Sequence, residues 1–294
     1  MTKCIICFKE KITEDHIIPL AFGNKKYTLS CVCKKCNSLL GDNIDAANTN
    51  NILGKLVRKQ NNIKGRAKET PNPFSEGIAE YGKRIRLTQD YIPTVVDSCN
   101  YDEQTKTYQI SSSSPEKAIE IIDKELSRMN LPPLTEKQKD SIKSIKSKIY
   151  HPTIEYHFEF DILKYNLELI KIAYETLYYL YGDAIFSNIE VLKLREIIYN
   201  YIYKDDCDIE IFNNWAGGID NPFGDGMISY LKKKTKSDAL HIISVQIMDG
   251  YVAILIAVEG MSPSAVKLKS LEGFEKCKSR TGFVFYPSGE ILIE

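Results

Sequence analysis

The spacing of hydrophobic residues predicts four helices in the second and third quarters of the chain. The clearest lies at 161–182 and ends at Gly182; its apolar positions recur at helical intervals, at Ile162, Leu163, Leu167, Ile170, Tyr174, Leu177, Tyr178 and Tyr181. Further helices are predicted near 115–129, 135–148 and 188–203. The first of these follows an entry signal in which serines 111–114 precede Pro115.

Alternating hydrophobic and polar positions predict strands on both sides of these helices. The segment 153–160 alternates throughout, and further strands are predicted near 83–88, 92–97, 106–112, 239–247, 251–259 and 283–293. Residues 287–289, Pro-Ser-Gly, are expected to form a hairpin turn. No internal repeat is visible, so the pattern favours a mixed α+β fold for this part of the chain.

The first 66 residues have a different character. Residues 1–45 show little periodicity, and 46–66 indicate a basic helix with Ile52, Leu53, Leu56 and Val57 on one side. The stretch from Gly65 to Gly77 contains prolines at 71 and 73 and is the best linker candidate. We therefore expect a small module at 1–66 and a larger α+β domain at 67–294.

Charge and hydropathy narrow the function classes. The chain has 294 residues with 39 basic and 39 acidic side chains, but residues 1–66 hold 12 Lys/Arg against 5 Asp/Glu. A basic module on an acidic body is typical of a protein that contacts nucleic acid. The apolar run that includes 253–258 is far below the roughly 20 residues of a membrane span. With no recognisable signal peptide either, we expect a cytoplasmic protein without membrane contact.

The cysteines predict a metal site. Five of the eight fall within the first 36 residues, and four of them form two Cys-x-x-Cys pairs, Cys4 with Cys7 and Cys33 with Cys36. Four thiolates suit tetrahedral Zn²⁺, and a closed site of this kind stabilises a fold rather than catalysing a reaction. Cys31 could compete with Cys33 for a ligand place, although the two-residue spacing favours Cys33 and Cys36.

Polar residues beside the two pairs suggest a second site. Asp15 and His16 are adjacent and offer an oxygen ligand and an imidazole base, while Asn37 directly follows Cys36 on a short helix expected at 34–44. In a regular strand Asp15 and His16 would point to opposite faces, so a bulge or turn is needed to bring both to one centre. Taken alone, such a pair is more often an ordinary surface feature.

The order and spacing of these motifs resemble the HNH endonuclease family, over about residues 4–45. The matching elements are Cys4-x-x-Cys7, the run Asp15-His16-Ile17-Ile18-Pro19, and Cys33-x-x-Cys36-Asn37. The resemblance implies a zinc-stabilised ββα-metal module that cleaves nucleic-acid phosphodiester bonds with one catalytic divalent metal. It implies that His16 is the general base, with Asp15 and Asn37 as metal ligands.

The sequence departs from the family pattern at two places. The Asn usually found about five residues before the second pair is replaced by Thr28, with Asn24 and Ser30 as other candidates for its orienting role. The lysine usual after the second pair is absent, since Leu39, Leu40 and Gly41 follow instead.

The residues fit phosphodiester hydrolysis on chemical grounds. An ordinary imidazole titrates near neutral pH, and a carboxylate with an amide oxygen and waters suits Mg²⁺ or Mn²⁺. The expected products carry a 5′-phosphate and a 3′-hydroxyl. Four lysines flank the proposed centre and could contact backbone phosphates, namely Lys25, Lys26, Lys34 and Lys35.

The leading hypothesis is therefore a metal-dependent DNA endonuclease in restriction or anti-phage defence. The domain at 67–294 would supply specificity, oligomerisation or control by a regulatory protein or signal. Because one metal centre cuts one strand, a homo-oligomer is a possible partner arrangement. The alternative is a non-catalytic zinc-ribbon module that binds nucleic acid or protein, and a weaker third hypothesis makes 67–294 the enzyme.

Other conspicuous residues favour roles in packing or in loops. His151, His157 and His241 are isolated, and His157 and His241 favour structural roles. Tyrosines 174, 178 and 181 follow helical spacing, which favours packing over base stacking. The glycine-rich stretch 214–226 lacks the spacing of a phosphate-binding loop and is at most a recognition or lid loop.

Overall fold

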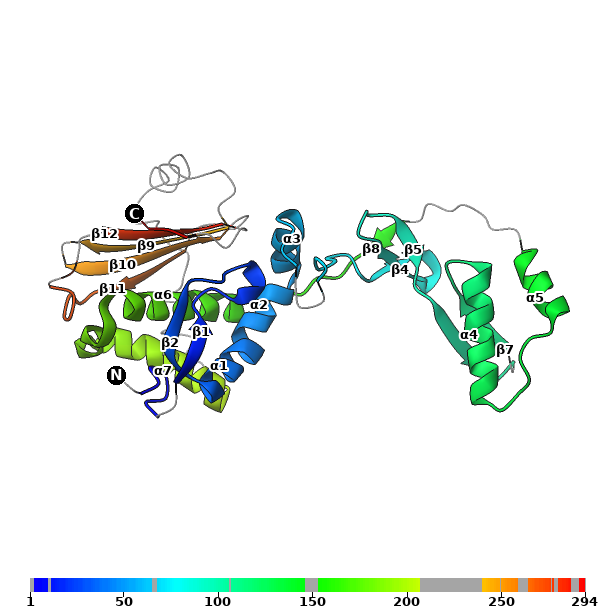
Figure 1. The fold of residues 1–294 in the computed structure, drawn as a ribbon, viewed down its shortest axis with the longest axis horizontal. Coiled ribbons are helices and arrows are strands. Elements are labelled where there is room, and N and C mark those ends of the chain that lie inside the picture. The colour runs from blue at the N-terminus through cyan, green and yellow to red at the C-terminus, as the bar shows by residue number, and fades with distance from the viewer. Residues whose placement is uncertain are drawn as a thin grey trace. The chain divides into compact units, whose positions relative to one another are not determined.

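The computed structural model divides into two compact units (Figure 1). The structure describes residues 3–9, 12–64, 68–105, 107–145, 153–206, 240–248, 250–258, 264–275, 277, 280–286 and 291–293. The first unit combines Met1–Pro71 with Glu159–Glu294, and the second is Asn72–Phe158. This division differs from the expected boundary after residue 66, because the N-terminal module packs with the last third of the chain.

The N-terminal module is a ββα arrangement. The strand β1 (Ile12–His16) pairs antiparallel with β2 (Thr28–Cys33), the turn η1 (Leu20–Phe22) lies in the loop between them, and α1 (Lys34–Leu40) follows β2 directly. A π-helical turn, η2 (Gly41–Asp45), continues α1. The helix expected at 34–44 is therefore confirmed, with a change of winding at Gly41.

The basic helix expected at 46–66 is two shorter helices. They are α2 (Ala46–Asn50) and α3 (Ile52–Gln60). The break falls at Asn51, whose backbone is extended and whose side chain accepts a 2.8 Å hydrogen bond from the N–H of Gly54. An Asn in this position is a good N-cap, so it starts a new helix rather than continuing the old one.

The C-terminal third forms an open antiparallel sheet in the order β11-β10-β9-β12-β13. The strands are β9 (His241–Met248), β10 (Tyr251–Val258), β11 (Ser264–Leu268), β12 (Arg280–Phe285) and β13 (Ile291–Ile293). The expected strands 239–247 and 251–259 are confirmed, and 283–293 corresponds to β12 and β13. The hairpin turn expected at 287–289 and the glycine-rich stretch 214–226 lie outside the described residues.

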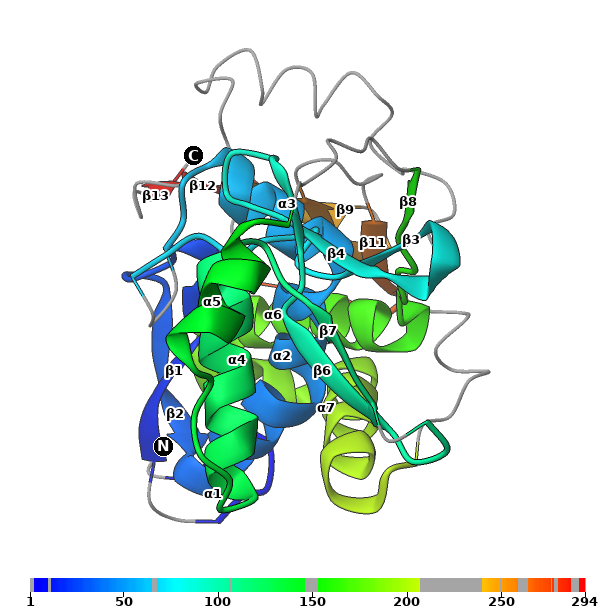
Figure 2. The same ribbon diagram turned by 90° about the vertical axis from the view of Figure 1, so that its right-hand side faces the viewer.

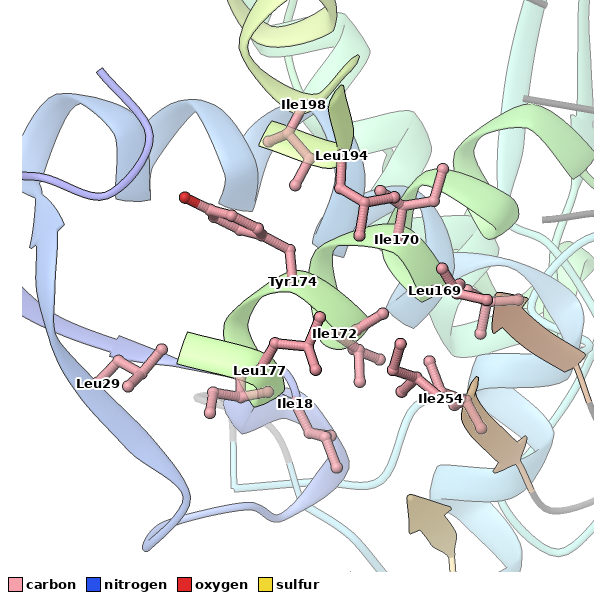
Figure 3. Packing of buried hydrophobic residues seen from close by; sticks show 14 of the residues in the cluster. Ile18, Leu29, Leu169, Ile170, Ile172, Tyr174, Leu177, Leu194, Ile198 and Ile254 are labelled. Atoms are coloured by element: carbon pink, nitrogen blue, oxygen red, sulfur yellow. The ribbon is translucent and has the colours of Figure 1, made fainter. Parts of the chain in front are cut away.

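A long helix, α6 (Ile162–Tyr181), packs against this sheet at β10 and β11. The turn η4 (Gly182–Ser187) joins it to α7 (Ile189–Lys204), which packs against α6, and both helices confirm the sequence prediction. The helix α6 is central: Figure 3 shows Leu169 and Ile172 near Ile254 of β10, and Leu177 near Ile18 and Leu29 of the N-terminal module. Every residue of α6 from 167 to 177 is consequently buried.

One hydrophobic core joins the N-terminal module to the C-terminal third. It runs through Ile5, Tyr27 and Leu40, continues into Tyr174 of α6, and reaches Phe283 of the sheet. The side chain of Tyr27, in the loop between β1 and β2, has its ring centroid 4.9 Å from those of both Phe283 and Phe285. The N-terminal module is therefore packed into the larger fold rather than attached at its surface.

The second unit is built differently. Its four-stranded sheet has the order β5-β4-β3-β8, formed by β3 (Gly77–Ala79), β4 (Arg84–Leu87), β5 (Pro93–Val95) and β8 (Ile154–Glu155), with the turn η3 (Glu80–Gly82) after β3. The hairpin of β6 (Ser98–Asp102) and β7 (Thr107–Ser111) lies beside α4 (Pro115–Arg128), and α5 (Glu136–Lys143) follows (Figure 2). The strand expected at 153–160 is limited to β8. No described residue between 98 and 143 is fully buried.

Among the described residues, no helix combines the length and apolar character needed to cross a membrane.

Candidate functional site

Four cysteines meet at the N-terminal end of the module. The Sγ atoms of Cys4, Cys7, Cys33 and Cys36 all lie within 4.8 Å of one another, and those of Cys7 and Cys33 are 3.6 Å apart. This is the donor set of a tetrahedral four-thiolate site, and it is compatible with zinc. The expected ligand set is thus brought together, whereas Cys31 lies outside the group.

Local backbone hydrogen bonds explain why these cysteines converge. The N–H of Cys4 donates to the carbonyl of Lys9 at 2.8 Å, and the N–H of Phe8 donates back to the carbonyl of Cys4 at 2.8 Å, so the first pair sits in a tight turn. Phe8 adopts a left-handed conformation, with φ of 56°, to close this turn. The second pair lies at the start of α1, where the Cys33 sulfur accepts the N–H of Cys36 at 3.4 Å.

The electrostatics of the cluster favour a bound cation. A hydrogen bond from Cys36 lowers the pKa of the Cys4 thiol to about 4, and the same contact raises the pKa of Cys36. The sulfurs of Cys4 and Cys36 therefore compete for one proton, and a bound cation would balance the charge of the thiolates. Burial raises the pKa of Cys31, which agrees with an inert packed thiol.

The second expected site lies at the end of β1. Asp15 is 4% exposed, and its Oδ1 accepts the N–H of His16 at 2.7 Å. Its Oδ2 is buried, and no group in the described part of the chain hydrogen-bonds to it. A buried carboxylate oxygen without a partner is costly. The atom is suited to hold a metal ion, which would compensate that cost.

Asn37 is anchored to the strand that carries Asp15. Its Nδ2 donates a 2.8 Å hydrogen bond to the carbonyl of Glu14, the residue before Asp15. The bond uses an N–H of the amide and leaves Oδ1 as the atom able to bind a metal. This bond ties the start of α1 to the end of β1.

His16 is the last residue of β1 and is partly exposed. Strand pairing is regular at Asp15 and His16, which lie opposite Leu29 and Thr28. The irregularity falls one step earlier, between Thr13 and Asp15, where β2 has one more residue than β1. The chain then leaves β1, so His16 occupies a strand end next to a turn rather than a strand interior.

Of the three candidates for the orienting role, Asn24 makes the most extensive contacts. Its Nδ2 donates to the carbonyls of Ile18 and Tyr27, each at 3.0 Å, and its Oδ1 accepts the N–H of Tyr27 at 3.0 Å. These bonds close the loop between β1 and β2. Thr28 instead donates to the Glu14 carboxylate at 2.9 Å, and Ser30 is exposed.

The flanking basic residues differ in exposure. Lys25, Lys26, Lys34 and Lys35 are exposed, and the ammonium of Lys35 lies 5.0 Å from the ring centre of Tyr203. Arg58 is buried, with its guanidinium 3.4 Å from the Thr49 carbonyl. Burial lowers the pKa of Arg58, which is part of the core rather than of a phosphate-binding surface.

Of the two other histidines that the structure describes, His241 lies in the core and His157 lies on the surface. His241 is buried against Phe22, and burial lowers its pKa to about 4. His157 is exposed in the second unit, and His151 lies outside the described residues. Neither described histidine adds to the site at the end of β1.

Sequence reasoning missed a group of charged residues on α6 behind β1. Lys171 and Glu175 are both fully buried, and the ammonium of Lys171 lies 3.2 Å from the carbonyl oxygen of His16. The signal was present in the sequence, because Lys171 and Glu175 interrupt the most hydrophobic helix of the chain. A charge retained within a buried helix face has a partner on another element.

Comparison with protein families agrees with this geometry. A family model described as HNH endonuclease matches residues 4–53, which cover both cysteine pairs, β1, β2, α1 and α2. Comparisons with curated proteins and with solved structures give no match. The cysteine cluster, the ββα arrangement and the family match together identify residues 4–53 as a module of the HNH endonuclease family.

Proposed function

We propose that the protein is a metal-dependent endonuclease that hydrolyses DNA phosphodiester bonds and leaves 5′-phosphate and 3′-hydroxyl ends. The family match supports a nuclease acting on nucleic acid. The observation that carries the proposal is the buried Asp15 Oδ2, which has no partner among the described residues; the amide of Asn37 is anchored to the carbonyl of Glu14, the residue before Asp15. A zinc-ribbon binding module has no use for such a carboxylate.

Asp15 and Asn37 would hold the catalytic ion, with waters and a phosphate of the substrate completing its shell. Their oxygen atoms are hard ligands that suit Mg²⁺ or Mn²⁺ rather than a second zinc. Such an ion stabilises the charge that develops on the phosphate and on the leaving 3′-oxygen. Two protein ligands predict weak binding of the ion without nucleic acid.

His16 would act as the general base. Its position at the exposed end of β1 gives the imidazole access to a water molecule in line with a phosphate. The exposed lysines at 25, 26, 34 and 35 would contact backbone phosphates on either side of the scissile bond. Asn24, by closing the β1–β2 loop, would replace the orienting Asn of the family.

We also propose that residues 67–294 limit where and when the module cuts, in restriction or anti-phage defence, through specificity, oligomerisation or a regulatory partner. The second unit supports the oligomerisation or partner role. Four of its apolar side chains are at least 39% exposed near the β6–β7 hairpin and α4, namely Tyr101, Tyr108, Met129 and Leu131. Light scattering at several protein concentrations tests whether this unit self-associates.

Plasmid nicking by the zinc-loaded protein tests the proposed activity. With Mg²⁺ or Mn²⁺ we expect nicked plasmid that DNA ligase reseals without prior kinase or phosphatase treatment. His16→Ala should lower the rate by about 10²–10⁴-fold, as expected for loss of a general base. His157→Ala, which removes an exposed histidine of the second unit, is the matched control and should cut normally.

Two results would contradict the proposal. Unchanged nicking by His16→Ala would remove His16 from the reaction. DNA binding that survives mild EDTA treatment, with no cleavage under any metal, would instead identify a zinc-ribbon binding module.

A further inference from the structure

We propose that Lys171 of α6 is a positioning residue for the nuclease site: its buried ammonium fixes the main chain of His16 and thereby the direction of the imidazole. The catalytic part of this inference rests on the proposed function of His16. It assigns a role to a residue more than a hundred positions beyond the HNH module. The helix that carries Lys171 is also the centre of the C-terminal fold.

The contacts of Lys171 are specific. Its Nζ donates to the carbonyl of His16 at 3.2 Å and to both carboxylate oxygens of Asp45, at 3.0 and 3.1 Å. The carboxylate of Glu175, one turn along α6, lies 4.0 Å away. One ammonium therefore links the end of β1, the end of the π-helical turn η2 and α6.

Burial makes this link strong. The Lys171 side chain has no exposed surface, and that of Asp45 is 18% exposed. Burial by itself lowers the pKa of Lys171, but the carboxylates of Asp45, Glu175 and Asp15 more than offset it, and the net shift is upward. Lys171 is thus held as a charged donor, and a charge-assisted hydrogen bond in a dry site has a well-defined geometry.

The carbonyl that Lys171 bonds belongs to His16, the proposed general base, whose orientation matters for the reaction. Beyond His16, the side chain of Asn24 holds the carbonyl of Ile18 at 3.0 Å. Lys171 and Asn24 together hold the main chain on both sides of Ile17. If the His16 peptide rotates, the Cα–Cβ direction of His16 rotates with it. A displacement of about 1 Å at a catalytic group is enough to slow a reaction by roughly a hundredfold.

Because Lys171→Met alone would leave the buried Asp45 carboxylate unpaired, each substitution of Lys171 is combined with Asp45→Asn and compared with Asp45→Asn alone. Asp45→Asn keeps Lys171 and its bond to His16. Asp45→Asn combined with Lys171→Met has the same net charge as the wild-type pair but no donor to His16. Asp45→Asn combined with Lys171→Gln again places an N–H donor at position 171, on a shorter side chain, for the His16 carbonyl. Zinc content and circular dichroism establish that each variant is folded.

The direct readout is the His16 carbonyl itself. Protein labelled with ¹³C at the histidine carbonyl and ¹⁵N in isoleucine gives correlated signals only from His-Ile peptides, which are His16–Ile17 and His241–Ile242. His241 lies in β9 and serves as an internal control. We expect Asp45→Asn to leave both signals near their wild-type positions. The Lys171→Met double variant should shift the His16–Ile17 signal alone.

Kinetics of plasmid nicking give the second readout. The Lys171→Met double variant should show kcat about 10–100-fold below Asp45→Asn with KM for DNA unchanged. The Lys171→Gln double variant should recover part of the rate. Two results for the Lys171→Met double variant would overturn the proposal. One is a His16–Ile17 signal that does not move. The other is a signal that moves while kcat stays equal to that of Asp45→Asn. If the wild-type protein cuts no DNA, the proposed function fails. The carbonyl signal then decides separately whether Lys171 holds His16.

Discussion

The hydroxyl of Tyr174 donates a 2.6 Å hydrogen bond to the main-chain carbonyl of Ile5. Ile5 lies between the first two cysteines of the four-cysteine cluster, and Tyr174 lies in the middle of α6, so the bond joins residues 169 positions apart. Both side chains are fully buried. The N-terminal module and the C-terminal fold are therefore expected to unfold together.

Replacing Tyr174 by Phe tests this connection. The substitution leaves the Ile5 carbonyl buried without a partner, which should lower the free energy of unfolding by about 1–3 kcal/mol. Tyr178→Phe is the matched control, because the Tyr178 hydroxyl bonds the exposed Asp183 carboxylate at 3.2 Å. The control should change stability by less than about 0.5 kcal/mol. Urea unfolding of zinc-loaded protein measures both, and equal effects would contradict the prediction.

Zinc content should distinguish substitutions in the four-cysteine cluster from a substitution at the nearby Cys31. Cys4→Ser removes one of the four sulfurs and should abolish stoichiometric zinc and most of the folded protein. Cys31→Ala removes a buried sulfur outside the group and should retain one zinc per chain. Elemental analysis of purified protein checks both variants. Zinc loss in Cys31→Ala would place that thiol in the site.

Loop closure by Asn24 predicts unequal effects of two substitutions. Asn24→Ala removes the bonds to the carbonyls of Ile18 and Tyr27, so amide hydrogens of the β1–β2 loop should exchange faster and nicking should slow by about 10–100-fold. Thr28→Val removes only the contact with the Glu14 carboxylate and should have a small effect. Hydrogen exchange and plasmid nicking measure the two variants. A larger effect from Thr28→Val would assign the orienting role to Thr28.

The buried His241 makes stability depend on pH. Burial lowers its folded pKa to about 4, so the unfolded chain binds this proton first as pH falls. Its contribution is complete above about pH 6.5 and is lost as pH falls towards 4; at pH 5 the loss is about 2 kcal/mol. Unfolding at pH 7 and pH 5 should therefore show a smaller loss in His241→Gln than in wild type. Equal losses would mean that His241 is not the group responsible.

Much of the local structure could be predicted from the sequence. The helix at 161–182 was predictable because its apolar spacing, its N-cap Asp161 and its terminal Gly182 all agree. The cysteine cluster was predictable because two cysteines separated by two residues can present both sulfurs to one ion from a single tight turn. Both signals are local, so neither requires knowledge of the tertiary fold.

The long-range arrangement could not be predicted in the same way. Tyr27 packs against Phe283, and Lys171 bonds to His16. Each contact connects two segments far apart in the chain, and the local sequence pattern does not indicate that they meet. The strand β11 was missed because Ser264–Leu268 is short and only partly hydrophobic, and it pairs with β10 at the sheet edge. Its strand conformation depends on that partner, as β propensity generally does.

Anomalous diffraction from Mn²⁺-loaded crystals tests the proposed nuclease site most directly. We predict a manganese peak within roughly 2.0–2.3 Å of Asp15 Oδ2 and Asn37 Oδ1, with the His16 imidazole facing the same centre. A crystal in which Asp15, His16 and Asn37 face apart, with no manganese between them, would contradict it.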